Sequence, residues 1–157
     1  MIIRHYQPTD FEDVRQLFKQ TIQTVNAKDY TPAQLTAWIG LDDAATRARW
    51  QTTLAAHTTL VASQADQLVG FADMTATGYL DRLYVHAEYQ RQGIAWALAT
   101  ALEQAIPVNR YETAASITAR PFFEQQGYQV IRVQQVERAG IKLTNYRMQK
   151  IINPDAK

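Results

Sequence analysis

The chain has 157 residues, of which 46% are hydrophobic and 20% charged, with a net charge of +1 and no cysteine. This length fits one ordinary domain with a sizeable core, and the composition excludes a disordered chain, a disulfide framework, a thiolate nucleophile and a cysteine zinc site. A nearly neutral chain lacks the basic field typical of nucleic-acid-binding proteins. The start, MIIRHYQPTD, lacks the apolar segment of a signal peptide, and no window approaches the roughly 20 apolar residues of a membrane helix, so we expect a cytoplasmic protein without membrane contact.

The first third of the chain predicts one strand followed by three helices, because capping signals precede apolar residues at helical spacing. Thr9 with Glu12, and Thr31 with Gln34, match the capping box, in which the first side chain and the one three residues later bond each other's backbone. Gly40 ends the second of these helices. The expected elements are a strand at 2–7 and helices at 9–25, 31–40 and up to about residue 56.

The remainder predicts a sheet interrupted by two helices. Polar turns at 65–66 and 139–140 indicate two hairpins. The expected strands are 58–63, 67–74, 78–85, 111–116, 128–136 and 141–151, with helices from Gly93 to about Ile106 and at 118–126. Because the first of these helices forms a crossover, strands 78–85 and 111–116 should be parallel neighbours. We expect a single α/β (α+β) domain over 1–157, with a mixed central β-sheet flanked by helices and a frayed tail at 153–157.

The loop at 87–93 ends a strand and begins a helix. The first backbone N–H groups of a helix have no partners within it and carry partial positive charge, which suits a phosphate. Gly93 lets a ligand approach the backbone without a Cβ in the way, and Ala95 keeps the next turn slim. Gln90 and Arg91 add side-chain donors. The pattern indicates a pyrophosphate held mainly by backbone amides.

Two blocks resemble the GNAT superfamily of acyl-CoA-dependent N-acetyltransferases. In YLDRLYVHAEYQRQGIAWAL, the segment 90–95 matches the family motif Q/R-x-x-G-x-G/A. The later block ASITARPFFEQQGY at 115–128 is similar to N-x-x-A-x-x-F-Y-E-x-x-G-F, and the matching residues are Ala119, Phe122, Glu124 and Gly127. Ser116 stands where Asn is usual, Phe123 replaces the usual Tyr, and Tyr128 replaces the final Phe.

The resemblance implies that strands 78–85 and 111–116 splay apart and that the pantetheine arm of acetyl-CoA enters between them. A backbone N–H near Leu83 or Tyr84 would polarise the thioester carbonyl. An amine would then attack the acetyl carbon directly in a ternary complex, with no metal. The implied cofactor-binding residues are Leu83, Tyr84, Val85, Gln90, Arg91, Gln92, Gly93, Ile94, Ala95, Ser116 and Phe123.

A primary amine, most simply that of a small molecule, is the acceptor that the resemblance implies. Protein N-termini or lysines are an alternative acceptor. A non-catalytic acyl-CoA-binding or regulatory module on the same fold is an alternative function, because fold alone does not determine function and Phe123 lacks the hydroxyl that protonates the departing thiol in many relatives. The protein could be a monomer or a homodimer.

Three carboxylates are candidates for the general base. Asp81 lies two residues before Leu83 on the central strand, and we expect it on the same face as Tyr79, Leu83 and Val85. Asp73 and Glu112 are alternatives, and each acid could instead pair with an arginine. Water or the Ser116 hydroxyl could serve as the acid.

Aromatic residues before the sheet could form the acceptor pocket, which in this family is walled by the first helical segment. Tyr30 and Trp38 are the candidates, with Glu112 on the opposite wall, although core packing is the ordinary role of a tryptophan. His5 and His57 show no metal-ligand spacing and no accompanying acidic cluster, so we expect no metal site.

Overall fold

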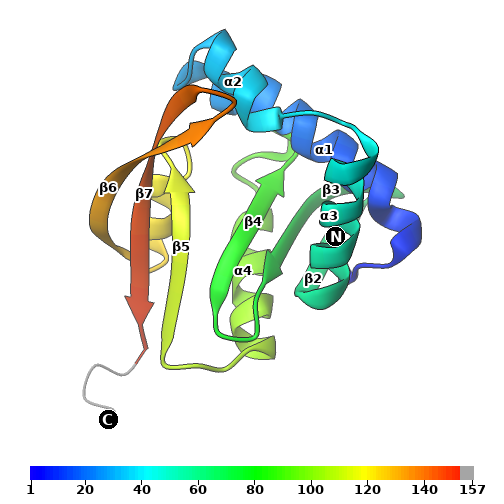
Figure 1. Ribbon diagram of the computed structural model, residues 1–157. Coiled ribbons are helices and arrows are strands. Elements are labelled where there is room, and N and C mark those ends of the chain that lie inside the picture. The colour runs from blue at the N-terminus through cyan, green and yellow to red at the C-terminus, as the bar shows by residue number, and fades with distance from the viewer. Residues whose placement is uncertain (153–157) are drawn as a thin grey trace.

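A computed structural model of the protein describes residues 1–152, and their strands form one seven-stranded mixed sheet (Figure 1). The order of the strands is β1-β2-β3-β4-β5-β7-β6, and β4 and β5 are the parallel pair. The strands are β1 (Ile2–His5), β2 (Thr58–Gln64), β3 (Gln67–Met74), β4 (Tyr79–Val85), β5 (Arg110–Ser116), β6 (Gln129–Arg138) and β7 (Ile141–Ile151). The expected frayed tail at 153–157 lies outside the described residues.

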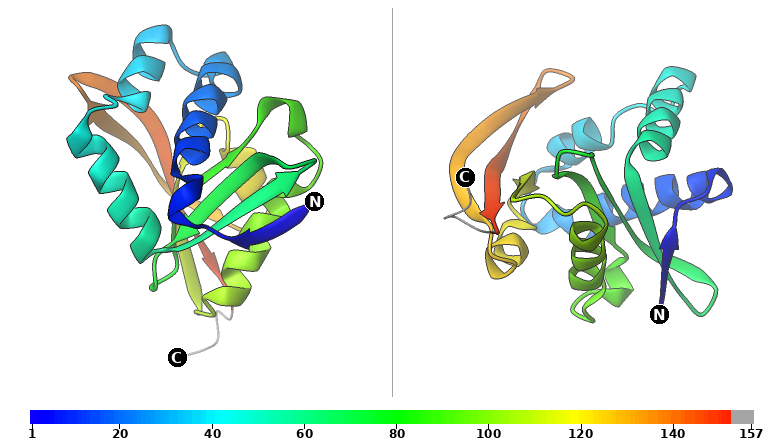
Figure 2. Two further views of the ribbon diagram at one scale, coloured as in Figure 1. Left: turned by 90° about the vertical axis from the view of Figure 1, so that its right-hand side faces the viewer. Right: turned by 90° about the horizontal axis from the view of Figure 1, so that it is seen from below.

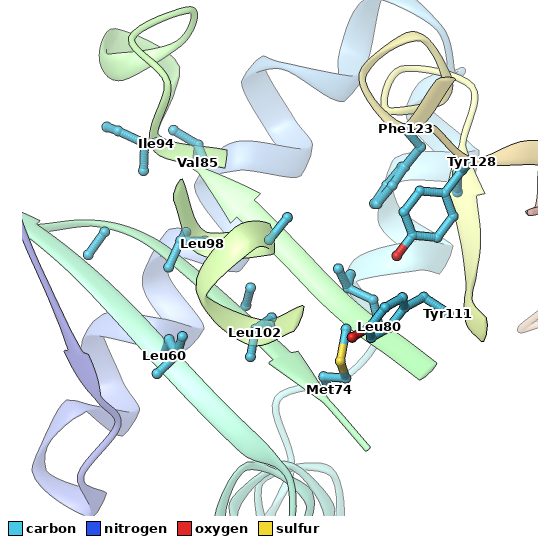
Figure 3. Packing of buried hydrophobic residues seen from close by; sticks show 14 of the residues in the cluster. Leu60, Met74, Leu80, Val85, Ile94, Leu98, Leu102, Tyr111, Phe123 and Tyr128 are labelled. Atoms are coloured by element: carbon cyan, nitrogen blue, oxygen red, sulfur yellow. The ribbon is translucent and has the colours of Figure 1, made fainter. Parts of the chain in front are cut away.

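Helices cover both faces of the sheet (Figure 2). They are α1 (Phe11–Thr24), α2 (Pro32–Ile39), α3 (Ala44–Ala56), α4 (Ile94–Ala105) and α5 (Arg120–Gln125). One core cluster joins α1 and α3 to the sheet through Val61 and Phe71. The other cluster packs α4 and α5 on the opposite face, where Leu80, Leu98 and Phe123 are buried (Figure 3). None of the helices in residues 1–152 has the length and apolar character needed to cross a membrane.

The predicted hairpin turns are confirmed. Ala65 and Asp66 have φ of 52° and 60°, and Ala139 and Gly140 have φ of 48° and 78°. Positive φ at both central residues is the geometry of the two-residue turn that matches the twist of a hairpin. Both pairs of strands are therefore connected as tightly as the sequence indicates.

One of the two predicted capping boxes is confirmed. Gln34 N donates to Thr31 Oγ1 at 3.2 Å, and Thr31 N donates to Gln34 Oε1 at 2.9 Å. The other was wrong, because the chain makes a short 3₁₀ turn at Pro8–Asp10 before α1. There Asp10 caps the turn by accepting from Gln7 N at 2.8 Å, and Glu12 pairs with an arginine of α3 instead.

The two parallel strands separate soon after they begin, as expected. Their pairing is limited to Tyr79 with Glu112 and Leu80 with Thr113. At this last pair the Thr113 hydroxyl donates to the carbonyl oxygen of Leu80 at 2.8 Å. Beyond it β4 and β5 diverge towards their carboxyl ends, as Figure 1 shows.

A β-bulge lies where the strands begin to diverge. Across β3 and β4, Asp73 pairs with Arg82 but Met74 pairs with Leu80, so Asp81 is an extra residue without a partner. A bulge of this kind re-aims a side chain and bends the strand.

The bulge corrects the prediction that Asp81 shares a face with Leu83 and Val85. Leu83 and Val85 pack into the α4 cluster. The guanidinium of Arg82 lies over the ring of Trp50, on the face covered by α1 and α3, 4.5 Å from its centroid. Asp81 lies beside Arg82 on this face, with Arg82 Nε 3.9 Å from Asp81 Oδ2. In a regular strand, consecutive side chains point to opposite faces. The extra residue allows the side chains of Asp81 and Arg82 to lie on the same face.

Candidate active site

The divergence of β4 and β5 opens a cleft of about 530 Å³ that reaches both faces of the sheet. From the α4 side it is lined by Gln90, Arg91, Gly93, Ala95, Trp96 and Phe123. From the opposite face come Trp38, Asp81 and Tyr84. Two ligands that enter from opposite faces could therefore meet between the strands.

The loop before α4 has the geometry of an anion site. Gly93 has φ of 83° and precedes the helix, whose first ladder bond runs from Ala97 N to Gly93 O at 2.9 Å. The three N–H groups between them therefore have no partner within the helix. A Cβ built at Gly93 would meet nothing within 4 Å, so the space in front of these groups is open. Glycine is favoured here by its positive φ as well as by access, and only the second reason was visible in the sequence.

Two predicted loop residues do not line the cleft with their side chains. Gln92 is exposed, and Ile94 is buried in the core beneath α4. Arg91 has φ of 61°, an unusual conformation for a side chain of this size, and it lines the cleft. Gln92 and Ile94 can thus contribute only through the backbone.

The backbone of β4 faces the cleft at Leu83 and Val85. His86 N donates to Val69 O of β3 at 2.8 Å, whereas Val85 O accepts from the side chain of Gln90 on the other side of the strand. Backbone groups alternate along a strand, so those of Leu83 face the same side as those of Val85. The residue between them, Tyr84, directs its backbone to β3.

Asp81 is the candidate base whose side chain reaches the cleft. It lines the cleft, and 39% of its side chain is exposed. Burial raises the pKa of its carboxyl, and the negative charge of Asp73 raises it further, against the opposing effect of Arg82 and His57. A raised pKa brings a carboxylate closer to the range in which a general base is effective at neutral pH.

The other two candidate bases are already bonded and do not line the cleft. Asp73 is fully buried, receives hydrogen bonds from Arg82 Nε at 3.1 Å to both oxygens, and lies 2.8 Å from His57 Nδ1. Glu112 accepts from Arg147 Nη2 of β7 at 3.1 Å. Geometry therefore favours Asp81 over Asp73 and Glu112.

Ser116 and Phe123 both line the cleft. Ser116 ends β5 and lines the cleft; its Oγ accepts from Ala119 N at 3.0 Å, which leaves the hydroxyl proton available. The Phe123 ring packs edge-on against Tyr128, with centroids 5.1 Å apart. Figure 3 shows the Tyr128 hydroxyl directed towards Tyr111, and Tyr128 does not line the cleft.

A second, smaller pocket of about 160 Å³ adjoins the cleft. It shares Trp38, Asp81, Tyr84, Ala114 and Ser116 with the cleft. Its additional walls come from the tip of the β6–β7 hairpin and from Tyr30 and Tyr79. Tyr30 and Trp38 thus both lie in this pocket, with their ring centroids 5.2 Å apart.

The hydroxyl of Tyr30 has a structural task. It donates to Thr144 O of β7 at 2.7 Å and accepts from Ile117 N at 2.9 Å. Burial raises the pKa of this hydroxyl. Tyr30 therefore offers its ring to the pocket and keeps its polar end for the fold.

The structure brings His57 together with two acids, which the spacing in the sequence did not reveal. The ligating atoms of His57, Asp73 and Asp81 lie within 4.8 Å of one another. The guanidinium of Arg82 already binds both oxygens of Asp73, so a cation there would have to displace it. We interpret the group as an ion-pair network behind Asp81.

Sequence reasoning missed many residues of these pockets, among them Trp96, Arg138 and Asn145. Trp96 lines the cleft and is 52% exposed, while Arg138 and Asn145 line the smaller pocket. Trp96 falls on the expected helix, and its exposure could not be read from that pattern. Arg138 directly precedes the predicted turn, which was the only local signal that it lies at a hairpin tip.

Comparison with known proteins identifies a family. Residues 26–150 match the model of the acetyltransferase (GNAT) domain. The uncharacterized N-acetyltransferase YafP of Escherichia coli (strain K12) is 37% identical over 146 residues, which cover 93% of each chain.

Solved structures share the fold. A crystal structure of a GCN5-related N-acetyltransferase from Rhodopseudomonas palustris is 30% identical, with a TM-score of 0.89 over 96% of this chain and 94% of that chain. The PaiA N-acetyltransferase of Thermoplasma acidophilum, solved in complex with coenzyme A, has a TM-score of 0.74 at 16% identity, covering 96% of this chain and 99% of that one. The second likeness concerns the fold alone.

Proposed function

Because the chain belongs to the GNAT acetyltransferase family and is an acyltransferase, we propose that it transfers the acetyl group of acetyl-CoA to a primary amine of a small molecule. The observation that carries this proposal is the cleft between β4 and β5, which is open to both faces of the sheet and has Asp81 in its wall. One opening would admit the thioester and the other the amine.

The residues on the α4 side fit a coenzyme A thioester. The open space before Gly93 and the unpaired N–H groups of α4 suit its pyrophosphate, with Arg91 as an additional donor. The backbone groups of Leu83 and the N–H of Val85, which face the cleft, would bond the pantetheine amides as an added strand would, while Val85 O already accepts from Gln90.

The chemistry requires that the acceptor ammonium lose a proton before its nitrogen attacks the acetyl carbon. Asp81 would take this proton, directly or through water. A C–N bond then forms, the C–S bond breaks, and the electron pair leaves with sulfur as a thiolate. The nitrogen passes a second proton to this sulfur through water or the Ser116 hydroxyl, giving an amide and the thiol of coenzyme A. The Leu83 N–H faces the cleft and could donate to the carbonyl oxygen as negative charge develops on it.

A small acceptor is favoured by the walls and the size of the second pocket. The tip of the β6–β7 hairpin is held against α2 by Gln34, whose Nε2 donates to Lys142 O at 3.0 Å, and by Tyr30. A pocket of about 160 Å³ has room for about five waters at about 30 Å³ each. That is the size of a small metabolite.

The test is release of free thiol from acetyl-CoA in the presence of a panel of small amines, with the acetylated product identified by mass spectrometry. We expect amine-dependent release by the purified protein. Calorimetric binding of coenzyme A without turnover of any amine or peptide would contradict the proposal and support a non-catalytic acyl-CoA-binding module. Turnover of peptides alone would contradict the small-molecule acceptor.

A further inference from the structure

Opposite charges line the smaller pocket. Asp81 lies where the pocket meets the cleft, and Arg138 contributes the guanidinium at the end of β6. Both charges act on the same neighbour, since Asp81 raises the pKa of Tyr79 and Arg138 lowers it. The pocket is thus polarised between a carboxylate beside the reaction centre and a cation from the hairpin tip.

Arg138 is free to bind a ligand. Within residues 1–152 it makes no ion pair, whereas Arg147 on the neighbouring strand is paired with Glu112 at 3.1 Å. A guanidinium presents two parallel N–H groups that match a carboxylate. Arg138 lines the pocket, so a ligand in the pocket could reach this pair of donors.

Asn145 adds a second independent signal. Its Oδ1 is buried, has no hydrogen-bond partner among the residues that the structure describes, and belongs to a residue that lines the pocket. A buried oxygen without a donor costs about 1–3 kcal/mol. A ligand ammonium or amide N–H in the pocket would satisfy it.

Apart from Asp81, Arg138 and Asn145, the wall combines ring and apolar surface with the polar side chains of Ser116 and Thr144. Tyr30 and Trp38 pack edge to face, and Val136 and Leu143 complete the side formed by the hairpin. Since the Tyr30 hydroxyl is already bonded twice, the wall offers ring surface rather than further polar groups there. Asp81 and Arg138 carry the charges of this pocket, and Asn145 Oδ1 is its buried oxygen without a partner in residues 1–152, so these three residues are the ones suited to the charged ends of a ligand.

We propose that the acceptor is a small zwitterion of the amino-acid type, with its ammonium at Asp81 and Asn145 and its carboxylate at Arg138. This inference rests on the proposed acetyl transfer and adds the substrate class. The reaction is the one given above: the nitrogen gains the acetyl group, its proton passes to Asp81, and the carboxylate is unchanged.

The experiment compares amino acids with their carboxamides, which have the same amine and side chain but no negative charge. With saturating acetyl-CoA, we expect kcat/KM to favour the carboxylate by at least tenfold, about 1.4 kcal/mol. Arg138→Gln should remove most of this preference, because it should raise KM for the carboxylate much more than KM for the carboxamide. Arg138→Lys, which keeps the charge but not the paired donors, should retain part of it.

The matched control is Lys142→Gln. Lys142 is exposed on the same hairpin tip and does not line the pocket. The substitution therefore removes one positive charge, as Arg138→Gln does, without changing a residue of the pocket wall. It should leave the preference intact. Equal rates for acid and amide, or a preference that survives Arg138→Gln, would overturn the inference while leaving acetyl transfer in place.

If no amine is acetylated, the zwitterion can still be tested by measuring the binding of amino acids directly. Titration of the amino acids into the protein saturated with coenzyme A should show binding that Arg138→Gln weakens by about tenfold and Lys142→Gln does not. Absence of thiol release with every amine refutes the proposed function. Absence of Arg138-dependent binding refutes the zwitterion.

Discussion

Asp81 shows how one residue obtains a special role from its surroundings. The extra residue in β4 directs its side chain to the α1–α3 face, where Asp73 and partial burial both raise its pKa. Folding therefore disfavours the charged form. The stability that this group contributes is present when it is protonated and is lost as the pH rises through its raised pKa. A carboxylate held in this way is more useful for accepting a proton than for holding the fold together.

We predict that Asp81→Asn lowers kcat/KM by about 10² and removes the rising limb of its pH profile. In the natural protein this limb should have its midpoint above the ordinary pKa of an aspartate, 3.8. Asn cannot charge, so the variant should be at least as stable as the natural protein at neutral pH. Steady-state kinetics between pH 5 and 9, with thermal unfolding, measure both.

Asp66→Asn is the control for this prediction, because Asp66 lies in the exposed β2–β3 turn and asparagine tolerates its positive φ. It should leave the rate and the profile unchanged. An Asp81→Asn enzyme with nearly full activity would assign the base elsewhere.

Gly93 allows the anion site to be tested with little steric change. Gly93→Asn and Gly93→Asp are nearly equal in shape, both tolerate positive φ better than other side chains, and a Cβ there meets nothing within 4 Å. We predict that the Asp variant binds coenzyme A at least tenfold more weakly than the Asn variant, about 1.4 kcal/mol, because its carboxylate faces the phosphates. Calorimetric titration measures the difference. Equal affinities would remove the pyrophosphate from this loop.

At the scale of elements, the sequence patterns correctly predicted the features that depend on interactions between neighbouring residues. Turn residues fixed both hairpins, Thr31 and Gln34 fixed the start of α2, and the crossover helix fixed the parallel pair. The Thr9 capping box was wrong because the turn begins two residues earlier, where the Asp10 side chain accepts from Gln7 N. Capping motifs that overlap by two residues, as 7–10 and 9–12 do, cannot be ranked without the backbone.

The candidate site was predictable only in part. The loop at 90–95 is one continuous segment, so its motif and its place before α4 were both readable. The bulge at Asp81 is a property of register between two strands, and no residue type in β4 marks it. The network of His57, Asp73 and Arg82 comes from three elements, and its members are bonded only after β2, β3 and β4 have aligned.

The joint between α3 and β2 should be pH-dependent because His57 lies there. The hydrogen bond to Asp73 raises the pKa of His57 above its usual 6.5, against partial desolvation. Its contribution to stability is therefore fully present below pH 6.5 and is lost as the pH rises through the raised pKa. We predict that His57→Gln, which keeps a neutral donor, lowers the free energy of unfolding by about 1 kcal/mol at acidic pH and much less at pH 9.

Urea unfolding at pH 6 and 9 measures this difference. His5→Gln removes an exposed histidine on β1 and should change stability little at either pH. A loss of the same size at both pH values would show that His57 stabilises the joint by packing and not by its charge.

At the scale of the whole molecule, the smaller pocket, where we propose that the acceptor binds, depends on contacts between distant parts of the chain. The β6–β7 hairpin forms one wall and the segment around α2 the other, more than 100 residues apart in sequence. Tyr30 joins them, since its hydroxyl bonds Thr144 of β7 and the backbone at Ile117 just after β5. The same residue thus fixes the spacing of the two walls and the end of the strand that carries Ser116.

We predict that Tyr30→Phe destabilises the protein by about 1–3 kcal/mol, because the buried Ile117 N–H and Thr144 carbonyl lose their shared partner. It should also raise KM for the amine, since the hairpin would no longer be held at its distance from α2, while affinity for coenzyme A on the α4 side stays within about twofold. Tyr128→Phe is the matched control: the Tyr128 hydroxyl is buried and has no hydrogen-bond partner among residues 1–152, so its removal should be neutral or stabilising. Urea unfolding and steady-state kinetics on both variants separate the two hydroxyls. Equal destabilisation by the two substitutions, or an unchanged amine KM in Tyr30→Phe, would show that the pocket keeps its shape without this joint.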